Sequence, residues 1–360
     1  MPEKQHYAVL DGLRGIAAIS VVVFHLFESV YQDHSTNLFP HGFLAVDFFF
    51  CLSGFVLGYA YDDRAGKLSY YAFLKARLVR LHPLVILGTI LGVGIYFLDP
   101  WGNYPKEWSI KLVLIPYLQS NFLIPTSIQV PNRFGNLFPF NPPSWSLSLE
   151  YLASIIYIAI LWKLPRKILP ILISLAGISL ILLAHKFGTL SGGWHFDSYW
   201  VGVVRMLFSF LAGLTIKRYK LVVKNRIGYV LLCALLMVAF SFPNLNQNWL
   251  IELILIIIFF PIIISLGAGT KLTHRLLPFA DFLGKISYPL YITHYWLISS
   301  LSNLYKSAYT NKLNAPLVII GSTIFLILFA YLITRFYDEP LRRWLNKKLS
   351  SRTVAKVSRN

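Results

Sequence analysis

The feature that most constrains this chain is a series of long apolar runs, because about 20 mostly apolar residues can cross a bilayer as one helix. Hydrophobic residues make up 56% of the 360 residues and charged residues only 13%. That is about half the charged share of a soluble domain. A soluble core cannot bury so much apolar surface, so lipid must surround much of the chain. We expect an all-α, polytopic membrane protein.

About ten segments are candidate membrane spans. They are residues 9–30, 43–60, 81–98, 144–162, 168–185, 199–216, 227–242, 249–267, 286–304 and 316–337. Prolines interrupt the apolar segment 110–124, which we expect to be an interfacial or re-entrant part of a long loop. The first run contains Arg14 and is longer than the apolar core of a secretory signal, so we interpret it as a retained helix.

Lysine and arginine are distributed unevenly between the two ends of these spans. If the N-terminus is cytoplasmic, 24 of the 33 lie in inner segments and 6 in outer ones, and the other three lie within spans. Because cytoplasmic segments carry the excess of positive charge, both termini are predicted to be cytoplasmic. Most of the formal charge of +18 is then explained by the positive charge that cytoplasmic segments carry and by their contact with anionic lipid. A second interpretation is that these residues attract a polyanionic cytosolic cofactor. We expect no nucleic-acid partner, a membrane domain over 1–341 and a basic cytoplasmic tail over 342–360.

Several ionisable residues lie inside the predicted spans, where they are costly and usually face a cavity. Arg14 and His25 share the first span, and at 100° per residue they point the same way, about 16 Å apart. Counting about 1.5 Å per residue from the span ends places four residues at one level of the outer leaflet. These four are His25, Asp47, Glu150 and Arg205.

A histidine level with carboxylates suits general-base catalysis, because the carboxylate fixes the imidazole tautomer. We predict His25 as a candidate general base, with the carboxylates of Asp47 and Glu150 at its level and His294 nearer the midplane. The alternatives are histidines that serve packing, and Asp47 and Glu150 as helix-start residues favoured by the macrodipole.

Arg77 and Arg80 lie near the cytoplasmic boundary, three residues apart and therefore on one helix face. Arginine forks suit phosphate, although an interfacial helix anchored to lipid headgroups would show the same pair. The sequence contains no zinc-binding pattern, P-loop or dinucleotide fingerprint, so we expect no metal.

Seven short motifs occur in order between residues 10 and 340. They are Leu10–Ala18 followed by His25, Gly42–Phe55, Arg77 with Arg80, Trp145–Leu147 with Glu150, Arg205 with Gly213, Gly284–His294, and Glu339 with Pro340. Each motif is weak alone, but the series resembles the acyltransferase 3 family of integral membrane acyltransferases. The stretch 99–143 matches none of these motifs.

The resemblance implies transfer of an acyl group, commonly acetyl, from cytosolic acyl-CoA to a hydroxyl of a cell-surface glycan or its lipid-linked precursor. It implies the cell inner (plasma) membrane and no fused esterase-like domain. On this resemblance, His25 would be the general base or a transient acyl carrier, with Asp47 orienting it, and Glu150 and His294 would bind or polarise the acceptor. The donor would meet Arg14, Arg77 and Arg80, whereas the acceptor would meet a second set, with the stretch 99–143 helping to choose it. That set is His294, Tyr291, Arg205 and Trp145. A proton-coupled transporter or flippase, and an inactive scaffold, remain alternatives, and the oligomeric state stays open.

Overall fold

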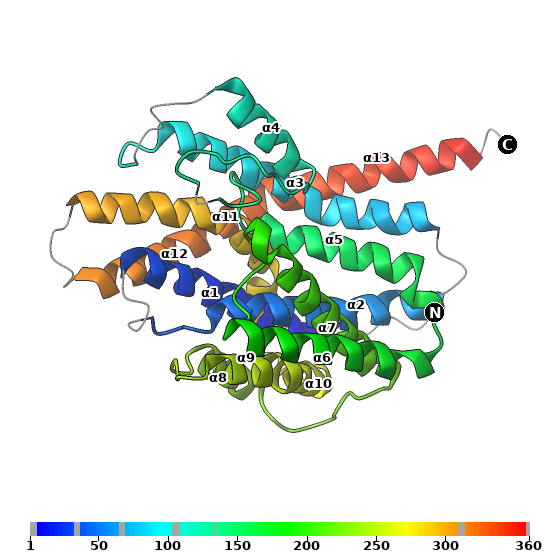
Figure 1. Cartoon of the computed structure of the whole chain (residues 1–360). Helices are drawn as coiled ribbons and strands as arrows, with labels where there is room; N and C mark the ends of the chain where they lie inside the picture. Colours follow the sequence, from blue (N-terminus) through cyan, green and yellow to red (C-terminus); the bar gives the residue numbers. More distant parts are fainter. Residues whose placement is uncertain are drawn as a thin grey trace.

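The computed structural model is a bundle of helices. It describes residues 6–31, 37–64, 69–102, 109–133, 135–308 and 314–357, with no β-strand among them. The helices are α1 (Ala8–Val30), α2 (Ala45–Tyr61), α3 (Tyr70–Leu98), α4 (Ile110–Asn121), α5 (Ser144–Ala159), α6 (Leu169–Phe187), α7 (Tyr199–Arg218), α8 (Tyr229–Phe240), α9 (Asn248–Ile254), α10 (Phe260–Gly269), α11 (Leu277–Ala308), α12 (Ala315–Ile333) and α13 (Glu339–Val357). Most run along one common direction, and the end of α13 projects from the bundle (Figure 1).

Eight helical stretches of the described chain are long and apolar enough to cross a membrane. They are Ala8–Val30, Gly42–Tyr61, Tyr70–Leu98, Ser144–Lys163, Arg166–Phe187, Phe196–Arg218, Asn248–Gly269 and Ala315–Leu349. The predicted spans 227–242 and 286–304 correspond to the shorter α8 and to α11, which are not among the eight. The all-α, polytopic class is therefore confirmed, while the count of ten spans and the orientation stay predictions.

Close helix crossings depend on glycines, as is common in membrane bundles. α1 lies along α11 at Gly15, where a Cβ atom would come within 2.6 Å of the Leu283 carbonyl oxygen. α2 lies against α7 at Gly54 and Gly213, where a Cβ atom would overlap backbone carbonyls of the opposite helix. These crossings place the motif residues of α1, α2, α7 and α11 at the centre of the bundle.

The loop before α5 is buried inside the bundle, whereas most loops lie at the surface. Phe140 and Asn141 are buried, and the Asn141 side chain donates a hydrogen bond to the Val85 carbonyl of α3 at 3.5 Å. The Phe140 carbonyl lies against Gly92, where a Cβ atom would overlap it. The segment 110–124, expected to be interfacial or re-entrant, forms the partly exposed α4, and the buried stretch of the loop follows it. As a result α5 begins in the interior of the bundle, beside α3.

Arg133 fastens this loop to α3 and α11. Its guanidinium stacks on the Trp296 ring at 3.6 Å from the centroid, lies 4.8 Å from the Tyr96 centroid, and donates to the Gly92 carbonyl at 3.2 Å. Burial lowers the pKa of Arg133 to about 10. The loop is therefore a fixed part of the fold.

The predicted boundary between a membrane domain and a tail at residue 342 falls inside α13. Arg342 lies 3.4 Å from Asp338, and Arg343 donates to Glu339 at 2.8 Å. The expected basic tail is therefore helical as far as Val357, and residues 358–360 lie outside the described part.

Candidate active site

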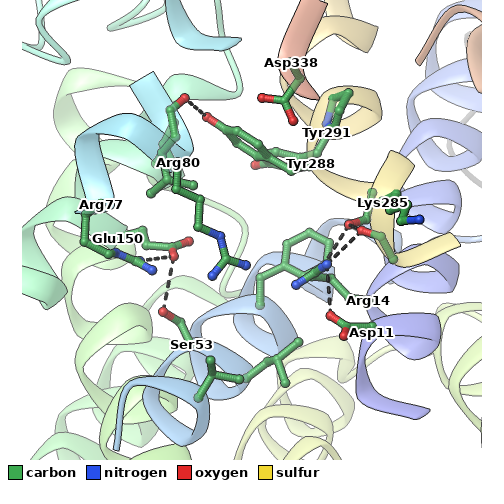
Figure 2. Close-up of a pocket in the computed structure, with 18 of the residues that line it drawn as sticks. Asp11, Arg14, Ser53, Arg77, Arg80, Glu150, Lys285, Tyr288, Tyr291 and Asp338 are labelled. Atoms are coloured by element: carbon green, nitrogen blue, oxygen red, sulfur yellow. Dashed lines mark hydrogen bonds and ion pairs between the residues drawn. The ribbon is translucent and has the colours of Figure 1, made fainter. Parts of the chain in front are cut away.

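A cavity of about 740 Å³ opens among α1, α2, α3, α5, α11 and the start of α13. Its lining extends from His6 and Asn346, at the end of the bundle where α1 begins, to Ser146 and Tyr291 in the interior. Figure 2 shows the Arg80 side chain reaching into its centre, facing Arg14 across the space. The structure thus brings together Arg14, Arg77 and Arg80, which the sequence assigned to the donor.

Arg14 is held in place by α11. Its Nε donates to Ser287 Oγ at 2.9 Å, its Nη2 donates to the Gly284 carbonyl at 2.7 Å, and Asp11 lies 3.0 Å away. The motif Leu10–Ala18 of α1 and the motif Gly284–His294 of α11 therefore meet at Arg14. A fixed guanidinium at this point presents positive charge to anything that passes along the cavity.

The two arginines of α3 differ in their surroundings. Arg77 Nη2 donates to Glu150 Oε1 at 2.5 Å, and Ser53 donates to the same oxygen at 3.2 Å. Among the described residues, no carboxylate lies within 4 Å of the Arg80 guanidinium. Arg77 is therefore neutralised by Glu150, whereas Arg80 can receive an anionic ligand.

The pairing of Glu150 corrects the predicted layer. We expected Glu150 level with His25, but it contacts Arg77 in the cavity. The reason is the buried loop before α5. Because α5 starts near Val85 in the interior of the bundle, Glu150, about 9 Å further along the helix, lies at the level of Arg77. Counting depth from the end of an apolar run assumes that the helix starts at the membrane surface, and α5 does not fit that assumption.

Asp47 also has a different partner from the one expected. It forms a doubly hydrogen-bonded ion pair with Arg205, and both side chains are almost fully buried, at 0% and 1% exposed. Arg205 donates in addition to the Gly192 carbonyl at 2.9 Å. The prediction that Asp47 orients His25 is therefore wrong. Two buried opposite charges at one depth pair with each other because an unpaired one is strongly destabilising.

Trp145 belongs to the same cluster. Its ring lies 5.8 Å from the Arg205 guanidinium and against Gly193, where a Cβ atom would overlap it. Asp47, Arg205 and Trp145 are not among the residues that line the cavity. They join α2, α5, α7 and the loop after α6, and their contacts among the described residues are with other protein groups.

His25 contacts a carboxylate of its own helix. Its Nδ1 donates to Glu28 Oε2 at 2.8 Å, and its side chain is 25% exposed. The ring stacks on that of His294 with centroids 5.3 Å apart, and the Tyr295 ring meets its edge. Glu28 was missed in the sequence, although its spacing of three residues from His25 is that of neighbours on one helix face.

His294 is completely buried and lies between His25 and the cavity. Its Nδ1 is 2.6 Å from the Tyr291 carbonyl and must donate to it. The Nε2 atom then carries a lone pair, and it has no partner in the described part of the chain. The Tyr291 ring is 5.8 Å from the His294 ring, and its hydroxyl is 2.7 Å from Ser146 Oγ. Tyr291 thus links the interior end of the cavity to the two histidines.

Comparison with known proteins identifies the family of this chain. Residues 7–335 match the family Acyl_transf_3, described as an acyltransferase domain. "Protein 2 in picA locus" of Rhizobium radiobacter is 30% identical over 195 residues, covering 52% of this chain and 97% of that protein. A Staphylococcus aureus (strain MRSA252) protein, provisionally named an O-acetyltransferase, is 28% identical over 372 residues, covering 96% of this chain.

The chain spans 58% of the length of that Staphylococcus aureus relative. Acyltransferase MdmB of Streptomyces mycarofaciens is 33% identical over 167 residues, covering 44% of this chain and 40% of that protein. No solved structure gives a significant match. The family match covers every motif from Leu10 to His294, and the chain therefore belongs to the Acyl_transf_3 family of acyltransferases.

Proposed function

We propose that the protein transfers an acyl group from acyl-CoA, bound in the cavity, to a hydroxyl of a glycan or lipid-linked glycan that approaches His25 from the other end of the bundle. One observation carries the proposal. A cavity lined by arginines ends at Tyr291, one helical turn along α11 from the residues that surround His25. Family membership supports acyl transfer over the transporter alternative, since the family is described as an acyltransferase domain and the Staphylococcus aureus and Streptomyces mycarofaciens relatives are named as transferases.

The donor fits the charges of the cavity. Arg80 has no carboxylate partner among the described residues, and Lys285 and Arg342 line the same space. The phosphates of acyl-CoA would meet these cations near the cytoplasmic end, because guanidinium and ammonium groups bind phosphate. The slender pantetheine arm would pass Arg14 and carry the thioester towards Tyr291.

In the proposed chemical step, His25 is the general base. Because its Nδ1 donates to Glu28, its Nε2 carries the lone pair. Nε2 would take the proton of the acceptor hydroxyl while the hydroxyl oxygen attacks the thioester carbonyl carbon. The C–S bond then breaks, the ester C–O bond forms, and the CoA thiolate takes up the proton. A route in which Nε2 first receives the acyl group gives the same products.

The acceptor would meet His294, whose unpartnered Nε2 can accept a hydrogen bond from a hydroxyl. The acetyl group is the acyl group we favour, because the Staphylococcus aureus relatives are provisionally named O-acetyltransferases. We place the protein in the plasma membrane, where both a cytosolic thioester and a glycan precursor are within reach.

Replacement of His25 tests the proposal. We expect His25→Ala to lower transfer of label from [¹⁴C]acetyl-CoA into the glycan fraction of host membranes by about 10²- to 10⁴-fold, the usual loss for a general base. His185→Ala, an exposed histidine at the end of α6, serves as the matched control. Label transfer that persists in His25→Ala at normal membrane abundance would refute the assignment.

A further inference from the structure

A smaller pocket lies where α2, α5 and α7 end, apart from the cavity that would hold acyl-CoA. Its volume is about 260 Å³, against about 740 Å³ for that cavity. The lining contains four cations and two carboxylates, a net charge of +2. These six residues are Arg166, Lys217, Arg218, Lys220, Asp62 and Asp63. The pocket therefore suits a small anionic group.

One of the four cations already has a partner. Arg218 donates to both carboxylate oxygens of Asp62, at 2.9 and 3.0 Å, and is only 6% exposed. The Tyr157 hydroxyl donates to the same carboxylate at 2.8 Å. This ion pair joins the ends of α2 and α7 and is neutral as a whole. The positive charge available to a ligand comes from the other three cations.

Those three cations have no acidic partner. Among the described residues, no carboxylate lies within 4 Å of the charged groups of Arg166, Lys217 and Lys220. The stem of Lys217 packs against α2 at Gly58, and its ammonium lies 5.2 Å from the centroid of the Tyr59 ring. Arg166 and Lys220 are exposed. Because like charges around one pocket repel each other, an anion between them would be stabilising.

Lys220 has a backbone conformation that is unusual for a lysine. Its φ is 57°, in the left-handed region that favours glycine. It follows the end of α7, where the Leu221 N–H donates to the Ile216 carbonyl at 2.9 Å, a helix end that commonly carries glycine. The helix dipole favours cations in the last turn, but a lysine inside that turn needs no such strain. Strained residues are common at ligand sites, so this position points to a role for the Lys220 ammonium.

Aromatic side chains indicate that the pocket lies at the membrane–water interface. Trp162 lines it, and the Tyr70 ring meets the Trp162 ring edge to face with centroids 6.4 Å apart. Tryptophan and tyrosine are enriched at this level of a membrane. Ile160 and Leu221, which are close to lining residues in the chain, are 53% and 51% exposed. They can contact the acyl chains of a lipid whose head group occupies the pocket.

We propose that this pocket binds the head group of an anionic phospholipid such as phosphatidylglycerol, with the phosphate between Arg166, Lys217 and Lys220. Basic pockets between membrane helices on the cytoplasmic side suit such head groups. Asp63, which is exposed and lines the pocket, can accept a hydrogen bond from a head-group hydroxyl. A free phosphate has no acyl chains to place against Ile160, so it should bind more weakly. The inference does not depend on the proposed function, because the acyl donor and acceptor take no part in it.

Native mass spectrometry of the full-length protein in detergent measures the affinity for the first bound lipid. The protein is titrated with phosphatidylglycerol and with phosphatidylcholine that carries the same acyl chains, and glycerol 3-phosphate is the free-phosphate probe. We expect phosphatidylglycerol to bind more tightly than phosphatidylcholine, and glycerol 3-phosphate not to displace it. Phosphatidylglycerol should also raise Tm, because a ligand that binds the folded state stabilises it.

The double variant Arg166→Gln/Lys220→Asn removes two of the three unpaired cations, and asparagine tolerates the left-handed conformation. We expect its affinity for the first phosphatidylglycerol to fall by about 25-fold, because each lysine or arginine near an anionic lipid contributes about fivefold. The single variant Arg166→Gln should lose about fivefold on the same basis, and it protects the test against a misfolded double variant.

The matched control is Lys167→Gln/Lys224→Gln. It removes two exposed cations that lie near the same positions in the chain but do not line the pocket. We expect this variant to keep the affinity of the wild type.

Three results would overturn the lipid site. The first is equal affinity of the wild type for phosphatidylglycerol and phosphatidylcholine. The second is an equal loss in the control and in Arg166→Gln/Lys220→Asn, which would show attraction by surface charge in general. The third is displacement of the lipid by glycerol 3-phosphate, which would assign the pocket to a free phosphate.

Discussion

The carboxylate of Glu28 pairs with His25, and the carboxylate of Asp47 pairs with Arg205. A base acts through the lone pair of one ring nitrogen, so the partner of the other nitrogen decides which tautomer is present. If His25 is the base, as proposed, Glu28 is the residue that would position it, whereas Asp47 pairs with Arg205 between α2 and α7. The positioning role of Glu28 can be separated from a purely structural one by kinetics.

We expect Glu28→Ala to lower kcat by about tenfold or more, a part of the whole contribution of a general base, while the KM for acetyl-CoA stays unchanged. Glu28→Asp should recover part of the loss. In a His25→Ala background, Glu28→Ala should cause no further loss, because residues that act as one unit are not additive. Steady-state kinetics of label transfer check all three variants. An additive loss in the double variant, or a rise in KM with unchanged kcat, would contradict the positioning role.

The residue types of the site could be predicted from the sequence, but their pairing could not. Charged residues within the predicted spans, together with the motifs, are sufficient to indicate Arg14, His25, Glu150 and His294. Depth along a helix is a single coordinate, and it does not say which neighbour lies beside a residue. Asp47 was level with both His25 and Arg205, and only the packing of α2 against α7 selects Arg205.

At the scale of elements, the crossing of α2 and α7 brings two backbones into contact. Gly213 has no room for a side chain, because its Cβ would overlap the Cys51 carbonyl. The same crossing carries the Asp47–Arg205 ion pair. Any separation of these two helices would expose an ion pair that is otherwise sealed from water and lipid.

We expect Gly213→Val to destabilise the fold by about 1–3 kcal/mol or more, the usual effect of forcing volume into a packed core, and to lower both Tm and membrane abundance. Gly321→Val on α12 is the control, because no heavy atom lies within 4 Å of a Cβ built there. Fluorescence-detected size exclusion after heating measures both variants in detergent. Equal Tm values for the two would show that the crossing tolerates separation.

The boundaries of most spans could also be predicted from hydropathy, but the depth at which α5 begins could not. A run of apolar residues shows where a helix is stable in lipid. It does not show that Phe140 and Asn141 lie between α3 and α11, because a buried loop has no period of its own. This single feature places Glu150 beside Arg77 in the cavity instead of in the predicted layer around His25.

At the scale of the whole molecule, the bundle has two unlike ends. One end of the cavity lies beside His6, Arg342 and Asn346, in segments that the distribution of lysine and arginine assigns to the cytoplasm. His25 lies towards the opposite end of α1. At this scale the fold class and the family could be predicted from the sequence, because composition and the order of motifs can be determined without knowing which residues are in contact.

We expect acyl-CoA to be used from one face only. Because its phosphates prevent passage through lipid, inverted vesicles supplied with external [¹⁴C]acetyl-CoA should transfer label, and right-side-out vesicles should not. Protease access to a C-terminal tag reports the orientation of each preparation. Equal transfer in both preparations would contradict a donor site at the end where α1 begins.

The closed inner end of the cavity has an electrical consequence. A water column running the full depth of the bilayer would let protons descend their gradient, and each elementary charge gives up about 2.3 kcal/mol per 100 mV of potential. The lining of the cavity includes Phe49 and Tyr291 but neither His25 nor His294, so among the described residues this cavity does not extend past His25 to the other end of the bundle. If acyl-CoA binds there as proposed, the protein can receive it from one face without joining the two aqueous compartments through this cavity.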